Sequence, residues 1–304
     1  MSKIIRLDGL TLTDTTAPKI IERDKIESDG SLFLFDPTLA QGAFTALGNG
    51  ATIPNALSNK AAALLAVPEI DTHGFVSSVA LANKFVVERT GRGGVHGIIT
   101  QSGTQAASGN LNWQILLPAA IRNHIFANRA TRKFFFSVWW KTTRPGLQGS
   151  SQAVAWATGQ TGATSNYLFH TESGIPRPSA GAASHLGSRA APATTETVAP
   201  VGSNRIANVG VNGQVGTGLA TATDVNPLAF VGTGGPWGGL NFDKAPSRIL
   251  YRAYVEDLTA SGRAYADVDA IDYALWQAAF GSGGKFNGDT YTDPASLAWV
   301  PAPT

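Results

Sequence analysis

An aromatic run marks the middle of the chain, in the segment 132–144 (RKFFFSVWWKTTR). Aromatic and β-branched side chains favour a pleated, buried surface, so this run predicts a central strand of a β-sandwich. Trp139 and Trp140 are neighbours on the strand and must face opposite sides of the sheet. One of the two is expected in the core, and the other against a second layer, a subunit or a ligand.

Shorter apolar runs, separated by turn residues, predict further strands. They span residues 4–7, 31–35, 85–87, 95–99, 153–156, 167–169, 205–211, 225–231 and 248–256. The runs 85–87 and 95–99 are expected to form a hairpin, and Asn212-Gly213 predicts a second tight turn. The pattern therefore indicates a mainly β protein.

Helical patterns are shorter and fewer. Residues 55–67 are rich in alanine and leucine, and either Asn55 or Ser58 could cap the helix that they form. Pro118 opens a second helical segment over residues 119–125.

The clearest helix follows the last strand and ends at Gly281. Its apolar residues recur at helical spacing and are Val268, Ile271, Leu275 and Ala279. Asp267 lies at its start, where a negative charge suits the positive end of the helix dipole. Asp269 and Asp272 share one face of the helix, and this charged face is expected to be solvated.

Turn-rich and apolar stretches divide the chain into three parts. Residues 1–70 are expected to form an extended N-terminal arm with one short helix, which anchors the protein on neighbouring subunits. Residues 71–290 hold the sandwich, including a long loop over 171–200 that is rich in proline, alanine, serine and threonine. Residues 291–304 form a C-terminal tail.

Charged residues make up only 14% of the chain, against about 25% in typical soluble domains. A surface poor in charge suits a protein that covers much of itself in an assembly. The net charge of +2 and the lack of a basic block give no reason to expect nucleic-acid binding. Cysteine is absent, which excludes disulfides and thiolate metal sites.

The N-terminal residues lack the apolar core of a signal peptide. Apolar runs also stay well short of the ~20 residues that span a membrane. The protein is therefore expected to be made in the cytosol, to leave by no usual secretory route and to insert into no membrane.

Three parts of the chain carry a resemblance to a known family. They are residues 112–128 leading into 134–141, residues 206–213 with a Val-Asn-Gly turn, and residues 248–269. An aromatic Phe-x-Val-x-Trp strand, then a hairpin, then a last strand that runs into a short helix resembles the concanavalin A-like or laminin-G-like jelly roll of bacteriophage virion proteins. The resemblance covers residues 75–290.

This resemblance implies a mainly β, concanavalin A-like jelly-roll β-sandwich with an extended N-terminal arm and a short C-terminal helix. It implies a virion structural protein, assembled in the host cytoplasm and placed on the tail (fibre or baseplate) or on the capsid as a decoration. The implied partners are other virion proteins and further copies of the chain, with a trimer favoured. Members often bind glycans, sometimes with calcium. The sequence holds no run of acidic and amide residues at the spacing of a calcium loop, so neither a metal nor a cofactor is expected.

Aromatic side chains are the best candidates for a host glycan site, because sugar C–H faces stack on aromatic rings. Trp237, in the glycine-rich loop 232–239, is the first candidate. Trp156 and Tyr167 follow it.

No motif predicts a catalytic residue. The five histidines form no zinc-binding motif, the glycine-rich stretches match no nucleotide-binding loop, and a Gly-x-Ser-x-Gly elbow is absent. The alternative function is a polysaccharide-degrading depolymerase on the same fold, with Glu256 and Asp257 at the end of a strand as its carboxyl pair. A third hypothesis, a bacterial sugar-binding module, is disfavoured by the missing signal peptide.

Overall fold

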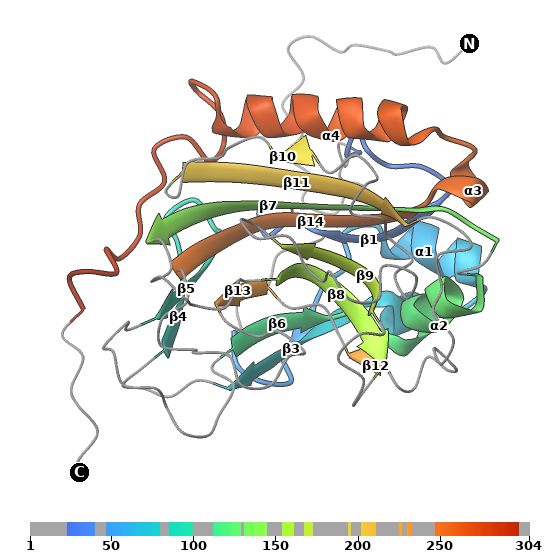
Figure 1. Cartoon of the computed structure of the whole chain (residues 1–304), viewed down its shortest axis with the longest axis horizontal. Helices are drawn as coiled ribbons and strands as arrows, with labels where there is room; N and C mark the ends of the chain where they lie inside the picture. Colours follow the sequence, from blue (N-terminus) through green and yellow to red (C-terminus); the bar gives the residue numbers. More distant parts are fainter. Residues whose placement is uncertain are drawn as a thin grey trace, which may run out of the picture.

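The computed structural model describes residues 23–39, 47–79, 85–99, 112–128, 131–144, 154–160, 167–172, 194–195, 202–210, 225–226, 230–232 and 247–297. Its strands form three antiparallel sheets, and few helices accompany them (Figure 1). The prediction of a mainly β chain is confirmed, and the arrangement is consistent with a β-sandwich.

The largest sheet has the strand order β10-β11-β7-β14-β5-β4, with β1 added beside β14. Its strands are β1 (Ser31–Phe35), β4 (Phe85–Arg89), β5 (Val95–Ile99), β7 (Phe134–Arg144), β10 (Thr194–Thr195), β11 (Gly202–Gly210) and β14 (Ser247–Asp257). β7 is the predicted aromatic strand, and it lies between β11 and β14 as a central strand. β5 and β1 share the other edge of β14, because β5 pairs with residues 248–250 and β1 with residues 253–256.

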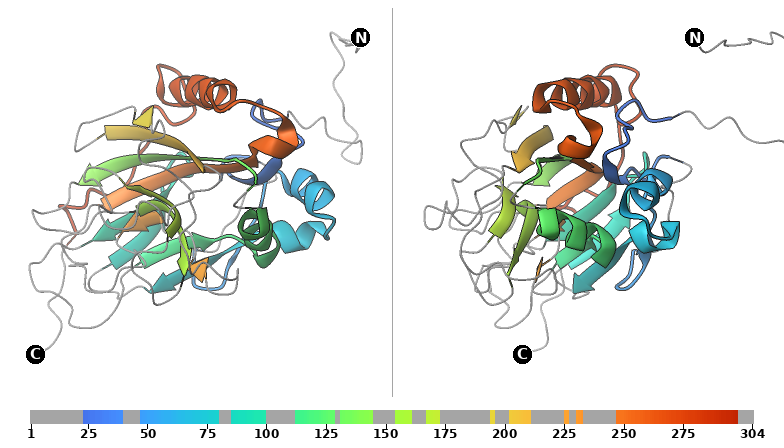
Figure 2. Two further views of the ribbon diagram at one scale, coloured as in Figure 1. Left: turned by 45° about the vertical axis from the view of Figure 1, so that its right-hand side comes forward. Right: turned by 90° about the vertical axis from the view of Figure 1, so that its right-hand side faces the viewer.

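The two smaller sheets have the orders β12-β8-β9 and β13-β6-β3-β2. Their strands are β2 (Thr52–Ile53), β3 (Gly74–Val79), β6 (Asn112–Leu116), β8 (Val154–Gln160), β9 (Tyr167–Glu172), β12 (Val225–Asn226) and β13 (Phe230–Gly232). The helices are α1 (Ser58–Leu65), the 3-10 helix η1 (Glu69–Thr72), α2 (Ala119–Asn128), α3 (Leu258–Ser261) and α4 (Tyr265–Phe280). Helix α4 lies on one face of the large sheet, and the sheet that holds β3 and β6 lies on the other (Figures 1 and 2).

The side chains of β7 alternate between these two faces, as period-two geometry requires. Phe136 and Trp140 join the apolar core between the sheets, where Trp113 of β6 also packs. Trp139 points the other way and packs in the cluster beneath α4. Both tryptophans are buried. The expectation of one core tryptophan and one facing a second layer is therefore confirmed.

Helix α4 covers the outer face of the large sheet with the residues that its periodicity predicted. Val268 is buried and Leu275 half-buried against Phe135 and Tyr254. The helix ends where expected, because the Gly281 N–H donates to the carbonyl of Gln277 at 2.8 Å.

Two predicted elements are wrong in detail. Residues 225–231 were expected as one strand, but β12 pairs with β8 while β13 pairs with β6, so the segment serves two sheets. Pro227 follows β12 and has no N–H to continue a ladder. Within the predicted loop 171–200, Thr194 and Thr195 form β10 against β11. Most of that loop, the strand at 4–7 and the Asn-Gly turn lie outside the described residues.

The predicted cap of α1 is also wrong. Leu57 occupies the N-cap position, and no side chain caps the helix there. The Asn55 carboxamide oxygen instead accepts from the N–H groups of Leu34 and Leu57, each at 3.0 Å, and so ties the start of the helix to β1.

The segment 1–70, predicted as an anchoring arm, contributes directly to the large sheet. All five residues of β1 are buried, and β1 pairs with β14. Residues 31–35 therefore complete the core of this chain. Anchoring on neighbouring subunits stays a prediction, and residues 1–22 lie outside the described residues.

Gly30, at the start of β1, has no room for a side chain. A β-carbon there would lie 2.2 Å from the carbonyl oxygen of Asp257 and 2.9 Å from Ser261. Gly30→Ala is therefore expected to lower the free energy of unfolding by about 1–3 kcal/mol, because backbone must move to admit the methyl group. Chemical denaturation measures this change.

Gly48→Ala is the matched control, because a β-carbon at Gly48 would meet nothing within 4 Å. This variant should unfold within about 0.5 kcal/mol of the wild type. Equal stabilities of the two variants would contradict the tight contact between the start of β1 and the end of β14.

Candidate functional site

Two of the three residues predicted to bind glycan lie in the three-stranded sheet. Trp156 is in β8 and Tyr167 in β9, and these strands pair with each other, Tyr167 opposite Gly159. Sequence reasoning placed both residues on strands, which is confirmed. Trp237 lies outside the described residues, as do the side chains of Trp156 and Tyr167, so their role in binding stays a prediction.

Glu256, one of the two depolymerase candidates, is fully buried at the end of β14. Its carboxylate accepts from the hydroxyls of Tyr254 at 2.7 Å and Ser28 at 2.9 Å. Arg263 forms an ion pair with both of its oxygens. This carboxylate therefore joins the segment before β1 to the segment after α3.

Asp257, the second candidate, is equally buried. One carboxylate oxygen accepts from the Ala260 N–H at 2.9 Å and so caps α3. The other accepts from His124 and Arg132, both at 2.8 Å. Burial alone would raise the pKa of Asp257, but these hydrogen bonds outweigh it and hold the pKa below its ordinary value. Neighbouring strand positions face opposite sides, so Glu256 and Asp257 do not flank one cleft.

Two aspartates of α4 pair with one arginine from the sheet. Arg205 of β11 donates its Nε to Asp272 at 2.7 Å, and its Nη2 pairs with the carboxylate of Asp269. The Trp139 indole N–H lies 3.2 Å from each carboxylate oxygen of Asp272. The prediction that Asp269 and Asp272 share a face is confirmed. The prediction of a solvated face is wrong for Asp272, which is fully buried because the face turns toward the sheet.

A second buried arginine lies next to this pair. Arg252 of β14 binds Asp24 at 2.8 and 2.9 Å and Asp36 at 2.9 Å, and its guanidinium lies over the Trp139 ring. Lys285 reaches Asp36 at 2.7 Å from the loop after α4. Burial acts to raise the pKa values of Asp24 and Asp36, but the two cations outweigh it and hold both pKa values below their ordinary range.

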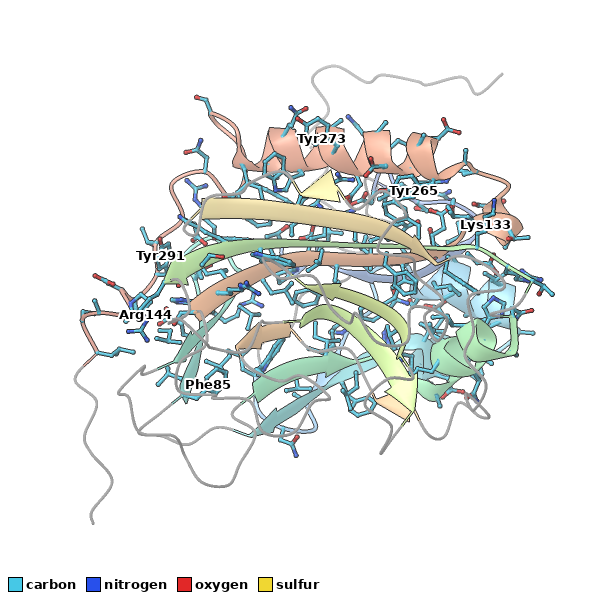
Figure 3. All side chains as sticks on the ribbon, in the orientation of Figure 1. Phe85, Lys133, Arg144, Tyr265, Tyr273 and Tyr291 are labelled. Carbon is cyan, nitrogen blue, oxygen red and sulfur yellow. The ribbon has the colours of Figure 1, made fainter. Side chains whose placement is uncertain are left out.

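We name this set of paired charges beneath α4 the ionic layer, and its members are Asp24, Asp36, Arg205, Arg252, Asp269, Asp272 and Lys285. Side chains fill the space between α4 and the large sheet, and the labelled Tyr265 and Tyr273 mark the helix in Figure 3. The layer connects the segment before β1, the strands β11 and β14, and the helix.

A local irregularity brings Arg252 into the ionic layer. The pairing of β14 with β7 shifts register between Leu250 and Arg252, so that Leu250 lies opposite Trp140 and Arg252 opposite Trp139. Strict alternation would have put Leu250 and Arg252 on the same face. The extra residue, Tyr251, reverses the alternation and turns Arg252 outward toward α4.

The histidines with described side chains have structural partners. His96 is buried between Glu88 and Thr143, each at 2.9 Å, and burial lowers its pKa despite the nearby Glu88 carboxylate. The Nε2 of His124 forms a hydrogen bond of 2.8 Å with the Asp257 carboxylate. Within the described ranges, no three histidine, aspartate or glutamate side chains gather as they would to hold a metal ion.

Sequence reasoning missed the arginines of the ionic layer. Arg205 is the one charged residue of β11, whereas Arg252 shares β14 with Arg248, Glu256 and Asp257, and both Arg205 and Arg252 are buried. An arginine next to apolar residues in a predicted strand was the available sign, since a buried charge requires a partner.

Comparison of the chain with protein-family models, with curated protein sequences and with solved structures found no match in any of the three. None of the described helices combines the length and the apolar character needed to cross a membrane. The resemblance to a jelly-roll family therefore stays a prediction.

Proposed function

We propose that the protein is a structural component of a bacteriophage virion, which assembles into the tail or capsid surface and presents a jelly-roll β-sandwich for binding. The observation that supports this proposal best is the ionic layer. Its buried charges pair with one another within the chain, and so they fix the positions of strands and helix. Charges held in this way suit a rigid scaffold.

The ionic layer also changes what the exterior can offer to partners. Charged residues are few in this sequence, and several of them are buried: Asp36, Arg205, Arg252, Glu256, Asp257 and Asp272. Fewer charges then remain for the surface. Depletion of charge is a feature of the centres of protein interfaces, so such a surface suits contacts with other virion proteins and with further copies of the chain.

The remaining parts of the proposal follow the sequence. A homo-oligomer, with a trimer favoured, would bring several copies of one binding face together and strengthen a weak contact with a host surface glycan. Trp156, Tyr167 and Trp237 are the residues proposed to stack on that glycan.

The test is the position of the chain in intact particles. Cryo-electron microscopy of the phage that encodes the protein should show it on the tail or capsid surface, in contact with other virion proteins. Mass spectrometry of purified particles gives an independent check. Absence of the chain from particles by both measurements would refute the proposal.

The depolymerase alternative is tested separately. Purified protein is incubated with polysaccharide from the host cell, and reducing ends are measured over time. We expect binding without an increase in reducing ends. Release of sugar in proportion to protein concentration would instead favour the enzyme, with a carboxyl pair other than the buried Glu256 and Asp257.

A further inference from the structure

A pocket of about 470 Å³ opens beside the C-terminal end of α4. It is formed by the end of the helix, the loop that follows it and the segments on either side of β1. Leu39, Leu275 and Ala278 give it an apolar wall. Sites for small molecules typically have volumes of roughly 300–1,000 Å³ and apolar walls with a few polar groups.

Three basic side chains line the same pocket: Arg23, Lys25 and Lys285. Lys285 donates to Asp36 at 2.7 Å and to Thr38 at 3.0 Å, which leaves one of the three N–H bonds of its ammonium group. Lys25 is exposed, and among the described residues it has no ion-pair partner. Lys25 therefore offers an unpaired positive charge to an anion, and Lys285 offers its remaining N–H.

The acidic residue at the pocket does not cancel this positive charge. Asp24 is the one acidic residue among the described residues that line it. Both carboxylate oxygens of Asp24 accept hydrogen bonds from Arg252, at 2.8 and 2.9 Å, on the side of the ionic layer. Arg252 and Lys285 together balance the charges of Asp24 and Asp36, so Lys25 keeps its positive charge for a ligand and Lys285 keeps one N–H donor.

We propose that this pocket binds a small organic anion with an apolar body. The carboxylate of such a ligand lies between Lys25 and Lys285, and its apolar body packs on Leu39, Leu275 and Ala278. Apolar burial supplies part of the affinity, and the positive charge of Lys25, together with the remaining N–H of Lys285, selects for an anion. The site does not depend on the virion role proposed above.

Octanoate is the probe, because it joins one carboxylate to an apolar chain. The full-length protein is titrated with octanoate at pH 7 and low salt, and binding is followed by calorimetry and ligand-observed NMR. We expect saturable binding at one site. 1-Octanol, which has no charge, and inorganic phosphate, which has no apolar body, should each bind at least about tenfold more weakly, which corresponds to a loss of 1.4 kcal/mol.

Two variants separate the apolar and the charged contributions. Ala278→Trp, at an exposed position of the helix, fills the pocket and should abolish saturable binding. Lys25→Glu should weaken octanoate binding about fivefold, the upper range for one exposed charge pair. Lys133→Glu is the matched control, because Lys133 is an exposed lysine that is not part of the pocket.

The proposal is overturned by any of three results. The first is no saturable binding of octanoate to the wild type. The second is equal affinity of the wild type and the Ala278→Trp protein. The third is equal affinity of octanoate and 1-octanol, which would show a purely apolar pocket. Circular dichroism and the melting temperature of each variant establish that it is folded.

Discussion

Replacing Arg252 with methionine is expected to lower the free energy of unfolding by about 3–5 kcal/mol, the usual cost of removing one partner of a buried ion pair. Arg252 is 1% exposed and binds two carboxylates, Asp24 and Asp36. Methionine keeps much of the apolar stem but leaves both carboxylates with a weaker counter-charge, since Lys285 reaches only Asp36. Urea denaturation at pH 7 measures the change.

Neutralising the partners provides the control. The triple variant Arg252→Met, Asp24→Asn, Asp36→Asn should recover part of the lost stability, because it buries no unpaired charge. If the single variant loses less than about 1 kcal/mol, the buried pairs do not form as described.

The single variant Arg252→Met should respond to pH in the opposite sense to the wild type. In the wild type the folded-state pKa values of Asp24 and Asp36 lie below the ordinary value of 3.8. The stability that these two carboxylates contribute is therefore present above pH 3.8 and is lost as the pH falls through their folded-state pKa values. Without Arg252 the buried carboxyls are more stable when protonated. The difference in stability between the two proteins should therefore shrink as the pH is lowered from 7 toward 4.

Trp140→Ala is expected to cost about 3–5 kcal/mol, because it empties a large volume in the core between the sheets. Trp140 packs there with Phe136 and Trp113, and it is 3% exposed. Thermal and chemical unfolding of the purified variant measure the loss. A loss below about 1.5 kcal/mol would mean that the sheets do not meet at this side chain.

Replacing either Trp139 or Trp140 with phenylalanine, in two separate variants, gives a sharper comparison. The Trp140 indole N–H is buried and has no hydrogen-bond partner among the described residues, whereas the Trp139 N–H donates to Asp272. The same chemical change should therefore cost more at Trp139, by about 1–2 kcal/mol. Equal costs at the two positions would contradict the hydrogen bond between Trp139 and Asp272.

The strands and helices were largely predictable because their patterns are local. The alternation of β7, the hairpin of β4 and β5, and the spacing of apolar residues in α4 each lie within a short window of sequence. The position of β1 was not predictable in this way, because it depends on pairing with β14 far along the chain.

The ionic layer was missed for a related reason. Predicting the ionic layer requires knowing that α4 covers the outer face of the sheet and that Tyr251 interrupts the alternation of β14. Neither fact has a local pattern in the sequence. An arginine in a strand predicts a charge at the surface unless the covering helix is known, so the burial of Arg252 cannot be predicted from the strand alone.

The placement of β7 has a consequence for how the chain folds during synthesis. The two strands that pair with it, β11 and β14, both come later in the sequence. While the ribosome makes the intervening residues, the aromatic strand has neither neighbour, and β1 must also wait for β14. Contacts so distant in sequence slow folding and prolong the exposure of apolar strand edges. The nascent protein should therefore depend on chaperones until the C-terminal third emerges, which makes the yield of folded protein sensitive to translation rate.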